Sequence, residues 1–168
     1  NKVKAIGLAD SFNLCGALEF AEKISKIGTQ PLIGTQINLL CNNEIGKVTL
    51  YATSEKGYQN LTKLSSLSYF KNKNAYDPHC EINDLILNNE DIILLTGSYN
   101  NFFGKLFYAN KEKYFEQIIE KLKSSFQDRL YIEIQRHEEN KETNYENYLL
   151  KISSSFELPL IAGQEVYY

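Results

Sequence analysis

The sequence predicts an α/β fold built around a mostly parallel β-sheet, and two observations support that prediction. Short apolar segments typical of buried strands recur along the 168 residues, and segments with helical spacing of apolar residues separate most of them. Parallel strands need crossover connections, which are usually helices. With about six strands, an open doubly wound sheet and a partial (β/α) barrel both fit this order of elements.

The first half of the chain predicts three strands and two helices. The strands are the apolar or alternating segments Lys4–Ala9, Pro31–Leu40 and Lys47–Thr53. The helices cover Gly16–Ile27 and about Glu55–Phe70, where apolar residues recur every three or four positions. The turn-rich letters CNNEIG join the second strand to the third.

The second half begins with a polar loop over Lys71–Cys80, and helices and strands then alternate. The predicted helices are Ile82–Leu87, Asn100–Ala109, Lys111–Phe126 and Glu142–Phe156, and the predicted strands are Asp91–Gly97, Arg129–Arg136 and Pro159–Tyr168. The chain contains no internal repeat and no long linker. We therefore expect a single domain over residues 1–168.

Composition excludes several classes of protein. The net charge of −3 gives no overall attraction to nucleic acid, and no apolar run approaches the roughly 20 residues that span a bilayer. The three cysteines are widely spaced, which argues against a disulfide framework or a zinc cluster and suits a reducing cytoplasm. The chain opens on Asn1, just before a strand-like run, so we expect a fragment of a longer cytoplasmic protein.

Candidate functional residues follow the predicted strands, because parallel α/β folds place their sites at the carboxyl ends of strands. The polar residues at these positions are Asp10, Ser11, Thr35, Gln36, Thr53, Ser98, Tyr99, Arg136, His137, Gln164, Glu165 and Tyr167. A centre with two or three metal ions needs several carboxylates and imidazoles. Asp10, Glu165 and His137 are too few for such a centre, and a single weakly bound metal is the most that they would support.

Three of these features allow two interpretations each. Asp10 is either a ligand or a cap for the helix that follows it. His137 either lines the site or is an exposed loop residue. The aromatic-rich segment Tyr99–Tyr108 either packs between helices or forms a surface that binds bases or an apolar partner.

Five segments, in order along the whole chain, resemble the PHP domain (polymerase and histidinol phosphatase) of bacterial DNA polymerase III alpha subunits. ADSFNLCGALEFAEKISKIGTQPLIGTQINL resembles T-D-x-x-N-L-x-G … K-P-I-x-G, and TLYATSEKGYQNLTKLSS resembles L-x-A-x-N-x-x-G-Y-x-N-L. DIILLTGS, YIEIQRH and LPLIAGQEVYY are similar to G-L-I-x-L-S-G-C, Y-L-E-L-Q-R-H and L-P-x-V-A-T-N-D-V-H-Y. The resemblance implies a distorted (β/α)7 TIM-like barrel, incomplete at its N-terminus because the family's first strand, with its H-x-H pair, is absent.

The resemblance also implies which residues stand at the family's metal-binding positions. Those positions hold Asp10, Ser11, Gln36, Lys47, Ser98, Glu165 and Tyr167. Ser11, Lys47 and Tyr167 stand where the family has histidine. Gln36 replaces glutamate, Ser98 replaces cysteine, and Glu165 replaces aspartate. Since an ammonium group repels cations, we expect a degenerate site with no catalytic residue, no metal and no cofactor.

In relatives with such a site, the resemblance implies a structural and docking role. We expect this chain to support the alpha subunit, a DNA-directed DNA polymerase and nucleotidyltransferase, and to bind the proofreading exonuclease subunit within the holoenzyme. DNA would be contacted only through the rest of the polymerase, and no membrane is involved. Phe103 and Phe107 are the candidate docking residues. The alternative is a phosphoesterase or 3′–5′ exonuclease with an atypical site that uses zinc or manganese.

Overall fold

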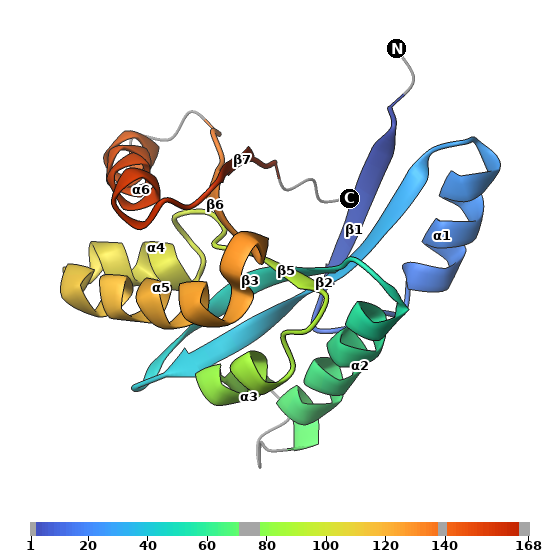
Figure 1. Cartoon of the computed structure of the whole chain (residues 1–168), viewed down its shortest axis with the longest axis horizontal. Helices are drawn as coiled ribbons and strands as arrows, with labels where there is room; N and C mark the ends of the chain where they lie inside the picture. Colours follow the sequence, from blue (N-terminus) through green and yellow to red (C-terminus); the bar gives the residue numbers. More distant parts are fainter. Residues whose placement is uncertain (1–2, 71–77, 138–140, 165–168) are drawn as a thin grey trace.

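The computed structural model describes residues 3–70, 78–137 and 141–164, in which a curled β-sheet carries helices on its outer side (Figure 1). The strands are β1 (Ala5–Ser11), β2 (Gln30–Cys41), β3 (Glu44–Ala52), β4 (His79–Glu81), β5 (Ile92–Leu95), β6 (Leu130–Ile134) and β7 (Leu160–Ala162). The helices are α1 (Ala17–Lys26), α2 (Glu55–Phe70), α3 (Ile82–Leu87), α4 (Phe102–Tyr108), α5 (Glu112–Phe126), the 3-10 turn η1 (Gln127–Arg129) and α6 (Glu142–Phe156).

The sheet is mostly parallel, as the sequence predicts. Its strand order is β1-β2-β3-β5-β6-β7, with β4 beside β2. Strand β3 is the exception, since it runs antiparallel to both β2 and β5. The reason lies in the two-residue turn before it, where Asn42 and Asn43 take positive φ values of 46° and 67°. A turn of this kind makes a hairpin, whereas a parallel connection needs a crossover.

The sheet curls into a half-barrel whose two edge strands are β1 and β7 (Figure 1). The strand register places Ala5, Gly7, Ala9 and Ser11 of β1 on the concave face. The aromatic ring of Tyr51 reaches over Gly34 toward Gly7, and a Cβ atom on either glycine would lie within 3.0 Å of the ring. The architecture is therefore an incomplete TIM-like barrel, which confirms the predicted barrel against an open doubly wound sheet.

The apolar core lies between the convex face and the helices. Alternate residues of the central strands point to this face, because side chains along a strand alternate between its two sides. They are fully buried: Ile37, Leu39, Val48, Leu50, Ile92, Leu94, Leu130 and Ile132. Helices α2, α4, α5 and α6 cover them, contributing Leu61, Leu64, Leu106, Phe115, Ile119, Leu122 and Leu149.

Of the two predicted docking residues in the aromatic segment, Phe103 lies in this core, which argues against a docking role for it, and Phe107 packs against the core. Phe103 has no exposed surface, and its ring lies 5.0 Å from that of Phe115 on α5. Phe107 is half-buried and stacks on Tyr148 of α6, with ring centroids 4.9 Å apart. Helix α4 packs between β3 and α5, so its rings face neighbouring helices on several sides. Packing between helices is therefore the correct interpretation of this segment.

Most other elements differ from the prediction by a few residues at their ends, and two segments differ more. The loop predicted over Lys71–Cys80 ends in strand β4, which pairs with β2, and the buried thiol of Cys80 donates a hydrogen bond to the Leu64 carbonyl. Residues 71–77 lie outside the described part of the chain. The last predicted strand is shorter, since β7 ends at Ala162.

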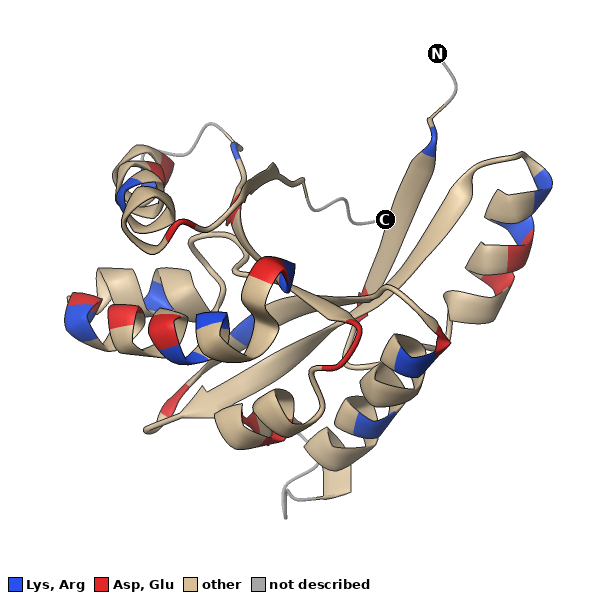
Figure 2. Ribbon diagram, in the orientation of Figure 1, with Lys and Arg blue, Asp and Glu red and all other residues tan. Residues whose placement is uncertain are grey.

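Charged residues occupy mainly the outer helices, with both signs interspersed and the strands largely uncharged (Figure 2). This distribution shows no concentration of Lys and Arg on one described helix. Across the described residues, no helix is both long and apolar enough to cross a membrane.

Candidate functional site

Three of the predicted site residues meet on the concave face where β1, β2 and β3 lie side by side. Ser11 is paired with Gln36, Gln36 with Thr49, and Asn38 with Lys47. Paired residues of neighbouring strands point to the same side of a sheet. Ser11, Gln36 and Lys47 therefore project into the half-barrel from three adjacent strands.

These three side chains form a hydrogen-bonded chain with one direction. The Lys47 ammonium donates to Ser11 Oγ at 3.0 Å, and Ser11 Oγ donates to Gln36 Oε1 at 2.9 Å. Gln36 is only 4% exposed, so the accepting end of the chain lies in the interior. The Lys47 ammonium also lies 5.5 Å from the centroid of the Phe12 ring, within the range of a cation–π interaction.

Phe12 forms the corner at which β1 ends. Its φ of 66° lies in the left-handed region, which is a strained conformation for a residue with a bulky side chain. Two hydrogen bonds hold it there: the Phe12 N–H donates to the Gln36 carbonyl at 2.8 Å, and the Tyr69 hydroxyl donates to the Phe12 carbonyl at 3.3 Å. The corner therefore directs the Phe12 ring toward Lys47.

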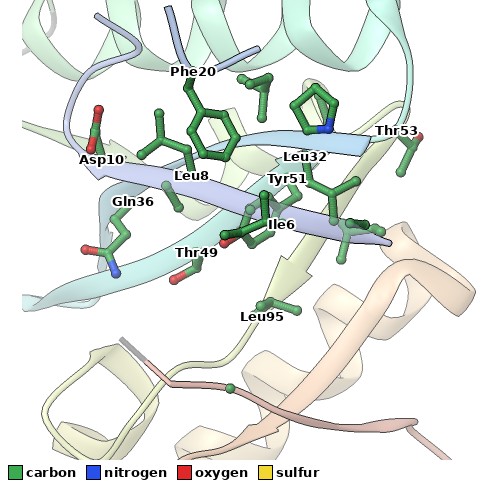
Figure 3. Close-up of a pocket in the computed structure, with 18 of the residues that line it drawn as sticks. Ile6, Leu8, Asp10, Phe20, Leu32, Gln36, Thr49, Tyr51, Thr53 and Leu95 are labelled. Carbon is green, nitrogen blue, oxygen red and sulfur yellow. The ribbon is translucent and has the colours of Figure 1, made fainter. Parts of the chain in front are cut away.

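Asp10 lies on the other face of β1, apart from this chain of hydrogen bonds. Figure 3 shows Asp10 and Gln36 on opposite sides of the strands, with Phe20 of α1 on the Asp10 side. A Cβ atom on Gly16 would lie 2.9 Å from Asp10 Oδ2, so the carboxylate faces the start of α1. It does not cap that helix, because α1 has no side-chain cap hydrogen bond. The predicted cap is wrong, and Asn13 Oδ1 instead accepts the Cys15 N–H.

A second polar group lies along β6 and the residues that follow it. Gln135 Nε2 donates to Glu133 Oε1 at 2.8 Å, and Gln135 Oε1 lies 3.3 Å from His137 Nε2. Because the Gln135 oxygen can only accept, His137 Nε2 carries the proton in this contact. The His137 backbone N–H donates to both oxygens of Glu142, at 2.9 and 2.8 Å. His137 itself is exposed, and Glu133 and Gln135 are buried.

Ser98 belongs to this second group rather than to the first. Together with Glu133 and Tyr145 it lines a small cavity of about 10 Å³ between β6 and α6. Burial, with the negative charge of Glu133, raises the pKa of the Tyr145 hydroxyl well above its ordinary value. Among the described residues this hydroxyl has no hydrogen-bond partner. Glu165 and Tyr167 lie outside the described residues.

Glu133 and Gln135 were missed from the sequence for a physical reason. The alternation of Leu130, Ile132 and Ile134 assigns the apolar side of β6 to the core and the polar side to solvent. In a barrel both sides of a strand are enclosed, so the polar side faces the interior. The signal that could have identified Glu133 and Gln135 is the alternation of polar residues along a strand of a barrel.

Among the described residues, the group formed by Ser11, Gln36 and Lys47 does not suit a metal ion. Ser11 and Gln36 offer neutral oxygens, and Lys47 brings a positive charge to the same place. At roughly 4 Å and an effective dielectric constant of about 20, an ammonium and a divalent cation repel by about 8 kcal/mol. In residues 3–70, 78–137 and 141–164, no group of three or more His, Cys, Asp and Glu side chains is placed to hold a metal.

The half-barrel encloses an open cavity of about 1640 Å³ along the concave face and the β1 edge. Leu32, Tyr51 and Leu95 give its concave part an apolar wall, and Ile6 and Leu8 line the part beyond the β1 edge, on the face that carries Asp10 (Figure 3). Ser11, Gln36, Thr49 and Glu133 contribute polar groups to the same wall. The cavity therefore combines an apolar lining with the two polar groups described above.

A half-barrel of this kind, with polar residues on its concave face, belongs to the class of TIM-like α/β barrels. Comparison with known proteins gives the family: the PHP domain model matches residues 1–137, and the chain belongs to the PHP domain family. A solved structure from Bifidobacterium adolescentis, described as a metal-dependent phosphoesterase, superposes with a TM-score of 0.60 over 95% of this chain and 76% of that chain. At 11% identity it supports the fold alone.

The curated relatives are DNA polymerase III alpha subunits. The subunit of Rickettsia conorii is 38% identical over 167 residues, and that of Rickettsia felis is 37% identical over the same length, in each case 99% of this chain. The Vibrio cholerae subunit is 30% identical over 96% of the chain. The chain spans 14% of the length of these relatives.

Proposed function

We propose that this chain is a non-catalytic PHP domain of a DNA polymerase III alpha subunit, which supports the polymerase and docks the proofreading exonuclease subunit. Its similarity to alpha subunits over 99% of its length supports the polymerase context. The observation that supports a non-catalytic role is the series of hydrogen bonds from Lys47 through Ser11 to Gln36. It occupies positions at which the family resemblance places metal ligands.

The same hydrogen bonds leave no activated nucleophile at this place. A serine becomes nucleophilic when a neighbouring base removes its proton. Here the Ser11 hydroxyl donates to the neutral amide oxygen of Gln36 and accepts from Lys47, which has no proton-accepting capacity while it is charged. Within the described residues, the Ser11 hydroxyl bonds to an amide and an ammonium group and not to an imidazole or a carboxylate. These contacts favour a structural role over hydrolysis.

Metal analysis of the purified chain, prepared without added metal, tests the loss of catalysis. We expect far less than one zinc or manganese per chain and no release of nucleotides from a DNA 3′ end. Asp10→Ala is the matched variant, and it should leave both results unchanged. A stoichiometric metal that Asp10→Ala removes, together with phosphoester hydrolysis, would establish the alternative of a phosphoesterase or exonuclease.

Competition tests the docking role. The intact alpha subunit is titrated with the proofreading exonuclease subunit, and the 168-residue chain is then added as competitor. We expect the chain to displace the alpha subunit, because docking would be carried by this domain. Failure of the chain to compete at concentrations well above the dissociation constant of the intact pair would contradict the docking role. Phe103 is unsuitable as a docking variant because it lies in the core.

A further inference from the structure

The Lys47 ammonium lies in a cradle of electron-rich groups. Ser11 Oγ lies 3.0 Å away and the centroid of the Phe12 ring 5.5 Å away. Gln36 Oε1 lies behind Ser11, which it contacts at 2.9 Å. A hydroxyl lone pair and the face of an aromatic ring both attract a cation. The surroundings of this side chain therefore suit a positively charged group.

The direction of the hydrogen bonds turns the lone pairs of Ser11 toward the positively charged group. Since the Ser11 hydroxyl gives its proton to Gln36, only its lone pairs remain for Lys47. Hydrogen bonds aligned in one direction polarise one another. Phe12, held in the left-handed region, places its ring at the same point. Ser11 and Phe12, at the end of β1, thus contact the Lys47 ammonium, and Gln36 in the middle of β2 holds the Ser11 hydroxyl.

The hydrogen bond between Lys47 and Ser11 also spans strand β2. Lys47 belongs to β3 and Ser11 to β1, and β2 lies between them. Neighbouring strands are about 4.8 Å apart, so β1 and β3 are separated by about 10 Å, which suits a side chain as long as lysine. In the described part of the chain, β1 pairs only with β2. Lys47 therefore gives this edge strand a direct link to a second strand.

We infer that Lys47 acts as a built-in monovalent cation that ties the end of β1 to the interior of β2 and β3, in a cation-binding cradle formed by Ser11, Gln36 and Phe12. The inference rests on the proposed function, because Lys47 stands at a position where the family resemblance places a metal ligand. It goes further in assigning the lysine a role: the chain itself supplies a cation that links β1, β2 and β3.

Chemical rescue of Lys47→Ala tests this role. The variant leaves the cradle intact and removes three methylene groups and the ammonium, which together correspond to n-propylammonium. We expect a lower thermal midpoint for the variant, with β1 amides exchanging faster with solvent. Adding ~100 mM n-propylammonium chloride should raise the midpoint by about 2–4 °C above the value in equal sodium chloride, as expected for a ligand that binds the folded state.

Two variants control for effects other than cation binding. Lys47→Met refills the space without a charge, so propylammonium should not raise its midpoint. Lys105→Ala removes an exposed lysine whose ammonium donates to the Ile45 carbonyl at 3.2 Å, and it too should show no rescue. Equal rescue of all three variants, or no rescue of Lys47→Ala, would overturn the inference.

A double-mutant cycle keeps the test decisive if Lys47→Ala does not fold. Lys47→Met and Ser11→Ala are compared with the double variant, and we expect the double variant to lose less stability than the two single losses combined. Additive losses would overturn the inference. Metal content of the wild-type chain separates the two proposals: stoichiometric metal would contradict the proposed function, whereas absent rescue without metal contradicts only the role of Lys47.

Discussion

Phe12 takes a backbone conformation that few residues of its size adopt, and the strain predicts how substitutions there differ. Both Phe12→Ala and Phe12→Gly lose the ring, but only glycine adopts a φ of 66° without strain. We expect the glycine variant to be more stable than the alanine variant by about 1 kcal/mol. Urea denaturation of the two variants measures the difference.

A control in the middle of β1 separates backbone strain from other effects. Ala9 lies in the strand, where no positive φ is found. There, Ala9→Gly should lower the free energy of unfolding by about 0.5–1 kcal/mol, because glycine loses more conformational freedom on folding. If Phe12→Gly is also less stable than Phe12→Ala, the left-handed conformation is not a source of strain at this corner.

Tyr145 gives a prediction about stability at alkaline pH. Burial and the charge of Glu133 raise the pKa of its hydroxyl, so the folded chain keeps the proton that the unfolded chain releases above about pH 10. The contribution is fully present below pH 10 and is lost as the pH rises, by at most about 1.4 kcal/mol per pH unit. Tyr145→Phe should therefore flatten the fall in unfolding free energy between pH 10 and 11.

The same variant should cost little at pH 7. Within the described residues the Tyr145 hydroxyl is buried without a hydrogen-bond partner, so its removal takes away a desolvated polar group. We expect a change within about 1 kcal/mol, measured by urea denaturation at both pH values. The alkaline slope will not disappear, because burial raises the pKa of Tyr148 as well. A large loss at pH 7 would show that the hydroxyl makes a stabilising contact.

At the scale of whole elements, α4 shows how composition misleads. Three phenylalanines in seven residues suggest more rings than one helix face can bury. The structure places Phe102 and Phe103 in perpendicular contact, 5.3 Å apart, with Phe103 against Phe115 and Phe107 against Tyr148. Because α4 is enclosed by a strand and two helices, several of its faces are buried. A periodicity argument that assumes one buried face per helix cannot detect this.

The resulting prediction concerns stability and not binding. Phe103→Ala should lower the free energy of unfolding by about 3–5 kcal/mol, because it removes a ring with no exposed surface and leaves a cavity. Leu18→Ala on α1 is the matched control, since Leu18 is 73% exposed and should change stability by less than about 0.5 kcal/mol. Urea denaturation measures both. Equally small losses for both variants would show that the Phe103 ring is not buried in the core.

Element positions were predictable from sequence where a periodic segment was long. The helices over Glu55–Phe70 and Glu142–Phe156 match the prediction at both ends, because apolar spacing reports helices directly. Strand β4 has three residues, which is too short to show a pattern. Its buried Cys80 bonds to the Leu64 carbonyl of α2, a contact that sequence periodicity does not report. Periodicity also does not show whether two neighbouring strands run parallel or antiparallel. The antiparallel direction of β3 follows from the tight turn at Asn42 and Asn43.

The sequence predicted which residues belong to the candidate site but not which of them lie next to one another. Ser11, Gln36 and Lys47 come from three segments, and only the strand register shows that they share a face. Asp10 and Ser11 are adjacent in sequence, yet successive residues of a strand point to opposite sides. Asp10 therefore lies on the face that carries α1, apart from Ser11, and a list of residue types does not contain this separation.

At the scale of the whole molecule, the β1 edge is open among the described residues. The Gln30 N–H donates to the Lys4 carbonyl and the Phe12 N–H to the Gln36 carbonyl, so the even-numbered residues of β1 bond to β2. In a parallel strand the odd-numbered residues then direct their backbone groups outward. Ile6 beside them is 43% exposed. An edge with free backbone groups and apolar side chains is a template for pairing with another strand.

We therefore expect the 168-residue chain to associate with itself as its concentration rises, and a charge on the edge to suppress that association. Ile6→Lys places an ammonium beside the unpaired backbone groups and should lower the weight-average mass measured by sedimentation. Ile27→Lys is the matched control, because Ile27 is 68% exposed but lies after α1, away from the edge. If both variants lower the mass equally, general hydrophobic contact and not the β1 edge drives association.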